Sequence, residues 1–426
     1  MSPTPMAKMP EPDLDFVPIP KERYTSAEFA AREWERMWTK VWLLAGRASD
    51  IPEPGDYFTF EIGRESILVV RQRDGSIDAR YNVCMHRGNR LREPGRGHAG
   101  EFRCLFHGWR YELDGSLKQA LDPECFPQGL PPEKLRLEPV RCDTWAGFVF
   151  VSLDPGVEPL RSYLGVVPEH LDPYGFENWK IAYDCTVEIE CNWKTCVDAF
   201  NEAYHLSSTH AWTVAFSDDV RTVYDCYGRH TRMIFPEVQA SPRFAPPGTV
   251  TDEIKEMFLK RVGVDVEGFS GDSDAARRAY ADAIRALGST LGADFSDLNE
   301  SQMCDDFHYT IFPNVTFNTH SLFVWVFTHR PHPTDPNRMY FDFINLVNAP
   351  AQEIPRPEKE CYSTANGDTL DGKCEGGDLL DEDLYNLPRI QRGMNSAAFR
   401  HLHLGTQEVR ILSHQATLMS YLEGRA

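Results

Sequence analysis

Two short cysteine–histidine motifs constrain the fold of this chain more than any other feature. The sequence contains Cys84-x-His86 and, after seventeen further residues, Cys104-x-x-His107. We expect each motif in a loop between strands, which is where metal ligands commonly lie. Two thiolates and two imidazoles can hold either a zinc ion or a [2Fe–2S] cluster. The segment around the motifs must therefore fold into a small domain that brings all four side chains together.

The order of the four ligands favours the iron–sulfur cluster. Zinc fingers usually place both cysteines before both histidines, whereas the order here is Cys-His, Cys-His. Two neutral imidazoles on one iron raise the reduction potential of such a cluster. The cluster can then accept an electron and pass it to an iron–oxygen centre. A structural zinc site is the alternative.

Bulk properties exclude several classes of protein. The 426 residues suffice for two or three domains. The net charge of −20, without a long Lys/Arg run, makes nucleic acid an unsuitable partner. The N-terminal residues lack the pattern of a signal peptide, and no stretch approaches the ~18 apolar residues that cross a membrane. We expect a cytoplasmic protein whose nine other cysteines are buried thiols.

The texture of the chain predicts an α+β protein. Residues 1–41 read as a proline-rich tail followed by a helix over 26–41, and this segment is expected to pack on the larger domain. Alternating apolar residues and turns over 42–155 predict a small all-β domain that carries both motifs. Residues 156–426 read as a second domain, which combines helices with strands over 307–349. The same reading predicts helices over 192–206, within 252–300 and near 406–422, and a loop over 351–380.

A second metal site is predicted within residues 192–210, NWKTCVDAFNEAYHLSSTH. Glu202 and His205 are three residues apart, so they share one face of a helix. His210 follows at a spacing that suits a ligand just past the helix end. Two histidines and a carboxylate make the ligand set of non-haem Fe(II) oxygenases.

Both regions resemble the large (α) subunit of aromatic-ring-hydroxylating, Rieske-type non-haem iron oxygenases. The resemblance rests on His86-Arg87-Gly88, on His107-Gly108-Trp109-Arg110-Tyr111 and on the 192–210 segment. It implies a Rieske domain over 42–155 and a catalytic domain of helix-grip (START-like) type over 156–426. It also implies roles for individual residues. These are Cys84, His86, Cys104 and His107 as ligands of the [2Fe–2S] cluster, and His205 and His210 as ligands of a mononuclear Fe(II).

The resemblance also gives Glu202 a role, as the carboxylate that relays between a cluster histidine and an iron-ligand histidine. Most ring-hydroxylating members carry Asp at this position, so the assignment to a dioxygenase subgroup stays open. The third iron ligand is expected to be Asp383, which precedes Gln391-Arg392-Gly393 at the spacing often found in the family. Asp381 and Glu382 are the alternatives. All three could instead complement a helix N-terminus, and Pro388 is expected to interrupt this helix.

The activity implied by the resemblance is that of a terminal oxygenase. It would use O2 and electrons from NAD(P)H, delivered by a reductase or ferredoxin, to hydroxylate or dihydroxylate an apolar, aromatic compound. A monooxygenase or demethylase for a polar or quaternary-ammonium substrate is the alternative. A Rieske electron carrier without oxygenase activity is a third possibility, from another class.

The resemblance further implies a homotrimer (α3), with or without a small β subunit (α3β3), in which Glu202 links His205 to His107 of the next subunit. Five arginines lie near the cysteine–histidine motifs: Arg87, Arg90, Arg92, Arg96 and Arg103. They are either solvated loop charges or a patch that steers an acidic electron donor. The stretch 252–300 is either a lid over the substrate or a structural insert.

Overall fold

The computed structural model describes residues 14–425 in two compact units. The smaller unit spans Trp34–Tyr163, and the larger one joins the residues up to Glu33 to those from Leu164 onward. The smaller unit thus extends beyond 42–155 at both ends. Residues 34–41 belong to it rather than to the larger unit, because the Trp34 ring packs closely over Gly63 and Arg64. The first thirteen residues of the expected tail lie outside the described part.

The smaller unit is built on an antiparallel sheet of seven strands in the order β2-β11-β10-β5-β4-β3-β6. Strand β3 alternates half-buried and buried residues, whereas β4 has five consecutive buried ones. Alternation is typical of a sheet with one solvated face. The strands are β2 (Leu43–Arg47), β3 (Asp56–Ile62), β4 (Glu65–Arg71), β5 (Ile77–Tyr81), β6 (Arg96–His98), β10 (Pro139–Trp145) and β11 (Phe148–Ser152).

The Cys84–His86 motif follows β5, whereas the Cys104–His107 motif lies between two strands of a second, three-stranded sheet. It consists of β7 (Phe102–Arg103), β8 (Arg110–Tyr111) and β9 (Leu117–Gln119). Its core includes both motif cysteines together with Phe102, Trp109 and Tyr111. Short helical turns complete this unit: the π-helix η1 (Trp34–Trp38) and the 3-10 turns η2 (Ala48–Asp50), η3 (Pro123–Cys125) and η4 (Pro132–Lys134).

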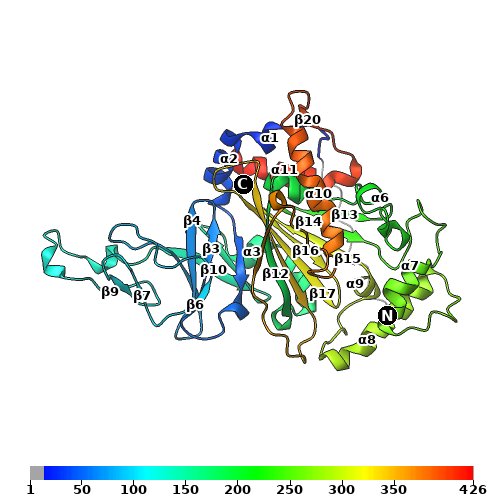
Figure 1. Cartoon of the computed structure of the whole chain (residues 1–426), viewed down its shortest axis with the longest axis horizontal. Coiled ribbons are helices and arrows are strands. Elements are labelled where there is room, and N and C mark those ends of the chain that lie inside the picture. The colour runs from blue at the N-terminus through cyan, green and yellow to red at the C-terminus, as the bar shows by residue number, and fades with distance from the viewer. Residues whose placement is uncertain (1–13, 426) are drawn as a thin grey trace. The chain divides into compact units, whose positions relative to one another are not determined.

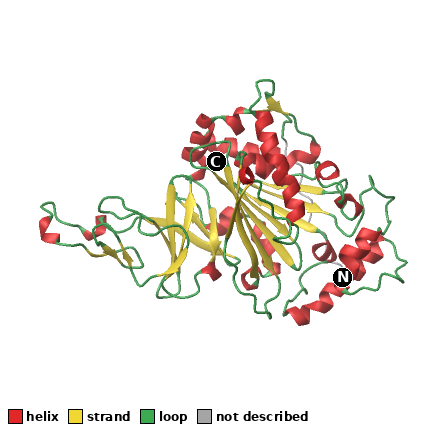
Figure 2. Ribbon diagram, in the orientation of Figure 1, coloured by secondary structure: helices red, strands yellow, loops and turns green. Residues whose placement is uncertain are grey.

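The larger unit contains an eight-stranded sheet in the order β13-β14-β15-β16-β17-β18-β12-β19 (Figure 2). All neighbours are antiparallel except β12 and β19. The strands are β12 (Lys180–Ile189), β13 (Val223–Tyr227), β14 (His230–Phe235), β15 (Asp306–Ile311), β16 (Val315–Thr319), β17 (Phe323–Pro331), β18 (Met339–Val347) and β19 (Glu360–Ser363). Strand β19 lies in the segment expected to be a loop, where ECYS gave too short a signal.

Helices cover both faces of this sheet (Figure 1). They are α1 (Glu22–Thr25), α2 (Ala27–Glu33), α4 (Val167–Leu171), α5 (Trp193–Ala199), α6 (Leu206–Thr209), α7 (Asp252–Ile254), α8 (Ser273–Leu291), α9 (Glu300–Cys304), α10 (Gly377–Met394) and α11 (Val409–Leu422). Helix α3 (Leu160–Leu164) spans the boundary between the units, and β1 (Ile19–Pro20) pairs with β20 (His401–Leu402). Shorter turns are η5 (Asp172–Tyr174), η6 (Phe176–Asn178), η7 (Thr213–Ala215), η8 (Lys255–Leu259), η9 (Lys260–Val262), η10 (Thr364–Asn366) and η11 (Thr406–Glu408). No described helix is both long and apolar enough to span a bilayer.

The two faces of the eight-stranded sheet differ in chemistry. Successive strand residues point to opposite faces. Tyr309 on β15 contacts the His170 ring of α4, so its face packs on the segment that precedes the sheet. Thr310 points the other way and donates to Asn201, which follows α5, at 2.6 Å. We call this second face, which bears Thr310, the site face.

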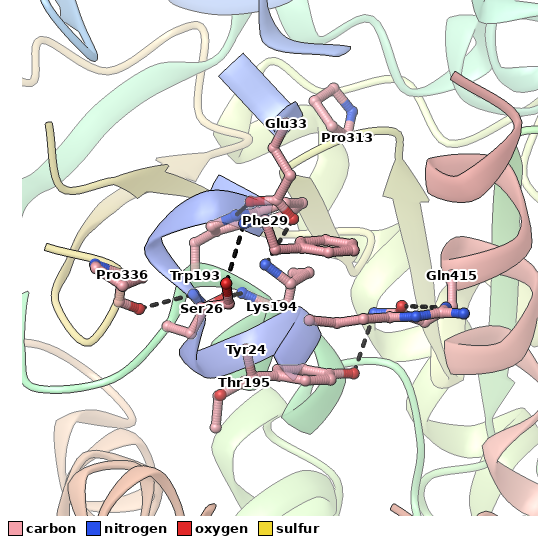
Figure 3. Close-up of polar contacts among 12 residues, drawn as sticks. Tyr24, Ser26, Phe29, Glu33, Trp193, Lys194, Thr195, Pro313, Pro336 and Gln415 are labelled. Carbon is pink, nitrogen blue, oxygen red and sulfur yellow. Dashed lines mark hydrogen bonds and ion pairs between the residues drawn. The ribbon is translucent and has the colours of Figure 1, made fainter. Parts of the chain in front are cut away.

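The N-terminal helices α1 and α2 hold helix α5 through buried polar contacts (Figure 3). Glu33 of α2 forms a 2.6 Å ion pair with Lys194, and both side chains are almost completely buried. Trp193 Nε1 donates to the other Glu33 oxygen at 3.2 Å. Nearby, the Tyr24 hydroxyl donates to Asp198 at 2.7 Å. Residues from 22 to 33 are therefore part of the support of α5.

Candidate metal centres

Two loops of matching shape present the cysteine–histidine motifs. The Gly88 amide donates to the Cys84 carbonyl at 2.9 Å, and the Gly108 amide donates to the Cys104 carbonyl at 3.0 Å. Both glycines have φ near +70°, which favours a residue without a side chain. The two loops therefore bring equivalent atoms of the two motifs to one place.

The donor set of this place fits an iron–sulfur cluster. The His86 and His107 rings lie 4.6 Å apart, centroid to centroid. Their Nδ1 atoms are buried and have no hydrogen-bond partner among the described residues. Cys84 and Cys104 are buried free thiols. Buried polar atoms are almost always bonded, so two unpartnered imidazole nitrogens beside two thiols are suited to ligate a metal group.

Aromatic residues of the same sheet fix these ligands. Trp109 stacks on the His86 ring at 4.9 Å. The Tyr111 hydroxyl lies 3.3 Å from the Cys84 sulfur and accepts from the Met85 amide at 3.0 Å. Burial raises the pKa of the Tyr111 hydroxyl, so it stays protonated and can donate to sulfur.

Most of the five arginines near these loops have local partners. Arg90 pairs with Glu61 at 3.2 Å, Arg96 pairs with Asp50 at 3.3 Å, and Arg92 lies over the Phe102 ring. The local contacts favour a structural role for these three side chains over a free positive patch.

The second candidate centre lies where α5 ends. The expected helix over 192–206 is wrong in its second half: α5 ends at Ala199, and α6 begins only at Leu206. In between, the Glu202 carboxylate accepts from the backbone amides of Tyr204 and His205. Asn201 is also turned toward the sheet by its bond to Thr310. The local bonds of Glu202 and the tertiary bond of Asn201 together outweigh the helical tendency of a stretch that contains neither Gly nor Pro.

His205, His210 and Asp383 each offer one ligand atom, and the three atoms lie within 4.8 Å of one another. Asp383 Oδ1 is 3.3 Å from His210 Nε2 and 3.8 Å from His205 Nε2. One carboxylate oxygen and two imidazole nitrogens therefore converge on a single point, as the facial ligand set of a mononuclear iron requires.

Carboxylates hold the far side of both imidazoles. Glu202 Oε1 lies 2.6 Å from His205 Nδ1, and Glu382 Oε2 lies 2.5 Å from His210 Nδ1. This pattern turns each Nε2 toward the metal position. Burial opposes the charged form of His205, but Glu202 and Asp383 together raise its pKa. The sequence did not reveal the role of Glu382, because its partner is 172 residues away.

The three acidic candidates for the third iron ligand lie next to one another on α10, but their side chains contact different groups. Asp381 accepts from the backbone amides of Leu370 and Asp371, Glu382 contacts His210, and only Asp383 faces both Nε2 atoms. The expected interruption at Pro388 is wrong, since α10 runs through it. Because proline has no amide hydrogen, α10 lacks the helical hydrogen bond from residue 388 to the Leu384 carbonyl. The helix nevertheless continues, and both residues are buried.

Gln391 fastens α10 to α5. Its side-chain oxygen accepts from the backbone amide of Asn192 at 2.9 Å and from the Thr195 hydroxyl at 3.0 Å. Its amide group donates to the Tyr24 carbonyl. The side chain is buried, so this contact fixes the distance between the helix that carries Asp383 and the helix that leads to His205.

Two family models match the chain. The model of the ring-hydroxylating alpha subunit (catalytic domain) matches residues 176–424, and the model of the Rieske [2Fe-2S] domain matches residues 41–131. The first match includes the His205, His210 and Asp383 centre, and the second includes both cysteine–histidine loops.

The individual relatives include both a monooxygenase subunit and a dioxygenase component. The glycine betaine monooxygenase oxygenase subunit of Pseudomonas aeruginosa is 31% identical over 192 residues, which are 45% of this chain and 44% of that protein. The match thus spans less than half of that relative's length. The large oxygenase component of a naphthalene 1,2-dioxygenase system from Pseudomonas aeruginosa is 26% identical and covers 84% of both proteins.

A solved structure shares the fold over nearly the whole chain. The quaternary ammonium Rieske monooxygenase CntA, in complex with L-carnitine, gives a TM-score of 0.69 at 21% identity. The alignment covers 98% of this chain and 99% of that one. The likeness therefore extends to the fold of both units.

Proposed function

Because the chain belongs to the family of ring-hydroxylating alpha subunits and carries a Rieske [2Fe-2S] domain, we propose that it is a terminal oxygenase. Its electrons come from NAD(P)H through a reductase or ferredoxin. The observation that carries this proposal is the convergence of His205, His210 and Asp383 on one point. A pure electron carrier has no use for such a centre.

The residues have the following proposed roles. Cys84, His86, Cys104 and His107 hold the [2Fe–2S] cluster, and His205, His210 and Asp383 hold the mononuclear iron. When bound, the two groups supply electron storage and dioxygen activation. Glu202 and Glu382 orient the two imidazoles, and the bond of Glu382 to His210 keeps the metal-facing nitrogen free of a proton.

We propose a polar organic cation, such as a quaternary-ammonium compound, as the substrate class. Glycine betaine and quaternary ammonium monooxygenases are among the similar proteins. Polar side chains on and near the site face, such as Thr310 and Asn201, favour the same class. This choice replaces the apolar, aromatic substrate expected from the sequence.

Dihydroxylation of an aromatic compound is the second candidate. Phe200, which precedes the metal segment, packs against Phe327 and Phe341 with ring centroids 4.9 and 5.8 Å apart. The naphthalene dioxygenase component is also similar over a long stretch. The mass of the product separates the candidates, since one added oxygen marks a monooxygenase and two mark a dioxygenase.

A head-to-tail homotrimer is the proposed assembly. The cluster loop exposes Leu105 and Phe106, which are 87% and 59% exposed. Beside the second centre, Tyr204 and Tyr385 are each 61% exposed. Apolar surfaces of this kind favour protein contacts, and a ring closes such an interface. Glu202 would then link His205 to His107 of the partner subunit.

Iron content and turnover test the oxygenase proposal. We expect three irons per chain, and oxygen consumption that depends on an added substrate, such as choline or glycine betaine, with a surrogate reductase. His205→Ala should keep the colour of the cluster and abolish turnover. Two irons per chain and no turnover with any substrate would instead indicate the electron carrier, and a colourless protein would indicate zinc.

A further inference from the structure

The site face of the sheet carries a row of polar side chains where a core would normally be apolar. His308 on β15 pairs in register with Asn318 on β16, Asn318 with Trp325 on β17, and Trp325 with Asn345 on β18. Directly opposed residues of an antiparallel pair lie on the same side of the sheet. The row therefore crosses four strands on the face that also bears Thr310.

Several of these buried groups lack a partner. Within residues 14–425, no hydrogen bond reaches His308 Nε2, Asn318 Nδ2, Asn345 Oδ1 or Asn201 Nδ2. His308 is 1% exposed, and Asn345 is 7% exposed. An unsatisfied buried polar group costs about 1–3 kcal/mol. Groups retained at this cost beside a candidate catalytic centre are suited to bind a polar ligand.

Two carboxyl groups lie close together at the end of the face away from Thr310. Asp306 lies four residues before Thr310 on β15, roughly 13 Å along the strand. Its Oδ1 has no hydrogen-bond partner in the described part of the chain, and the residue is 8% exposed. Glu237 is close by, since His320 lies 3.8 Å from Asp306 and 3.6 Å from Glu237.

Among residues 14–425, neither carboxyl group forms an ion pair with a lysine or an arginine. The nearby Arg410 donates to Thr231, His308 and Thr310 instead. Burial lowers the pKa of His320 to about 3, so His320 is neutral. Arg277 forms a bidentate contact with Asp305 instead. A buried carboxyl group either keeps its proton or finds a cationic partner, and here a ligand can provide the partner.

We propose that Asp306, together with Glu237, binds the positively charged group of an organic cation substrate. The proposal rests on the oxygenase function and names the residues that select its substrate. Phe323 and Trp325 line the same subsite: Phe323 stacks on His320 at 4.3 Å, and Trp325 follows at 5.6 Å. Aromatic faces attract organic cations. The subsite holds the cation at one end of the face and leaves the other end of the substrate near the metal centre.

The test compares choline with its neutral carbon analogue, in which carbon replaces the nitrogen. Isothermal titration calorimetry on the iron-loaded full chain should show choline binding at least tenfold more tightly than the analogue. Asp306→Asn should bring the ratio of the two affinities close to one. Asp305→Asn should keep the ratio, because this neighbouring carboxylate is engaged by Arg277. Thermal unfolding of each variant shows that it is folded.

The affinity for choline should also depend on pH. Burial raises the pKa of Asp306 to about 8, so cation binding must first ionise it. The groups facing Asp306 are Glu237, Asp305, His320 and Arg410 of α11. Choline should therefore bind more tightly at pH 8.5 than at pH 6.5 in the wild type, with a weaker dependence in Asp306→Asn.

Specific results would overturn the subsite. It fails if the analogue binds as tightly as choline, if Asp306→Asn keeps the wild-type ratio, or if calcium binds and choline does not. A wild type that oxidises a neutral aromatic compound without binding choline disproves the subsite and leaves the oxygenase function intact. Choline binding without substrate-dependent oxygen consumption disproves the function alone.

Discussion

Glu382 illustrates how a residue can support a metal site without touching the metal. It holds His210 as Glu202 holds His205, and Trp212 Nε1 lies 3.4 Å from the same Glu382 oxygen. Such outer contacts typically change metal affinity by 10–100-fold. We expect Glu382→Ala to weaken Fe(II) or Co(II) binding by about that factor, measured by competition with a chelator.

The matched control is Asp378→Ala, which removes an exposed carboxylate from the first turn of the same helix. This control should leave metal affinity unchanged. The metal affinity of Glu382→Gln should lie between those of Glu382→Ala and Asp378→Ala. Equal affinities for Glu382→Ala and Asp378→Ala would show that the contact to His210 is incidental.

Asp306 should make stability depend on pH in a defined direction. The pKa of an unfolded Asp is near 4, and in the folded chain burial raises it to about 8. Between these values only the folded state holds the proton, so rising pH costs stability, at most about 1.4 kcal/mol per pH unit. The free energy of unfolding of Asp306→Asn should therefore exceed that of the wild type by an amount that grows from pH 5 to pH 8. Urea titrations at several pH values measure this difference in the free energy of unfolding. A difference between the two proteins that stays constant with pH would contradict the prediction.

At the residue scale, sequence reasoning pointed to residues that carry a spaced motif, and the fold brings His205, His210 and Asp383 together. His205 and His210 stand out because they are five positions apart, and Asp383 because of Gln391-Arg392-Gly393. Glu382, Asp306 and Glu237 are as prominent in three dimensions but have no local signal. Their partners come from remote strands and helices, and a single sequence does not show such pairings.

Helix α5 depends on an ion pair buried behind it. Lys194→Met leaves Glu33 charged in an apolar surrounding, and breaking a buried pair typically costs about 3–5 kcal/mol. We expect that loss in the free energy of unfolding, whereas the double variant Glu33→Leu/Lys194→Met should lose less than either single variant. A double-mutant cycle in urea measures the coupling.

Lys255→Met is the control at this scale, since it breaks the exposed pair with Asp252, which is 93% exposed. The cost there should be about 0–1 kcal/mol. The ion-pair account fails if the loss for Lys194→Met is as small as this, or if the cycle shows no coupling.

Elements with strong periodicity were predicted correctly, and those shaped by tertiary contacts were not. The strands of 307–349 and the helix near 406–422 follow from their patterns. The end of α5 at Ala199 and the passage of α10 through Pro388 do not, because bonds to the sheet and to α5 decide them. Strand β19 escaped prediction because four residues are too few for a periodic signal.

At the scale of the whole molecule, the proposed ring predicts that two different defects can compensate each other. Cys104→Ser removes a proposed cluster ligand, and His205→Ala removes a proposed iron ligand. Each variant alone should be inactive. When they are co-expressed, about one in four head-to-tail interfaces should combine an intact cluster with an intact iron centre, so activity should return in part. Activity no higher than the sum of the separate variants would show that each chain serves its own centre.

The order of the domains was readable from the sequence because the cysteine–histidine loops sit in a β-rich segment and the 192–210 segment does not. The exact boundaries were not, since they depend on where Trp34 packs. The substrate class was the weakest inference. Aromatic residues on β17 and β18 suggested an apolar pocket, whereas the polar residues among them become visible only through the strand register.

The alternation of β15 has a consequence for how this protein could change in evolution or in the laboratory. Phe307, Tyr309 and Ile311 belong to the hydrophobic core, while Asp306, His308 and Thr310 face the site. Along these six residues, side chains that face the site therefore alternate with side chains that support the fold. A library that varies only Asp306 would change the site face while keeping the core residues of β15 and the contacts of His308 and Thr310 with Arg410.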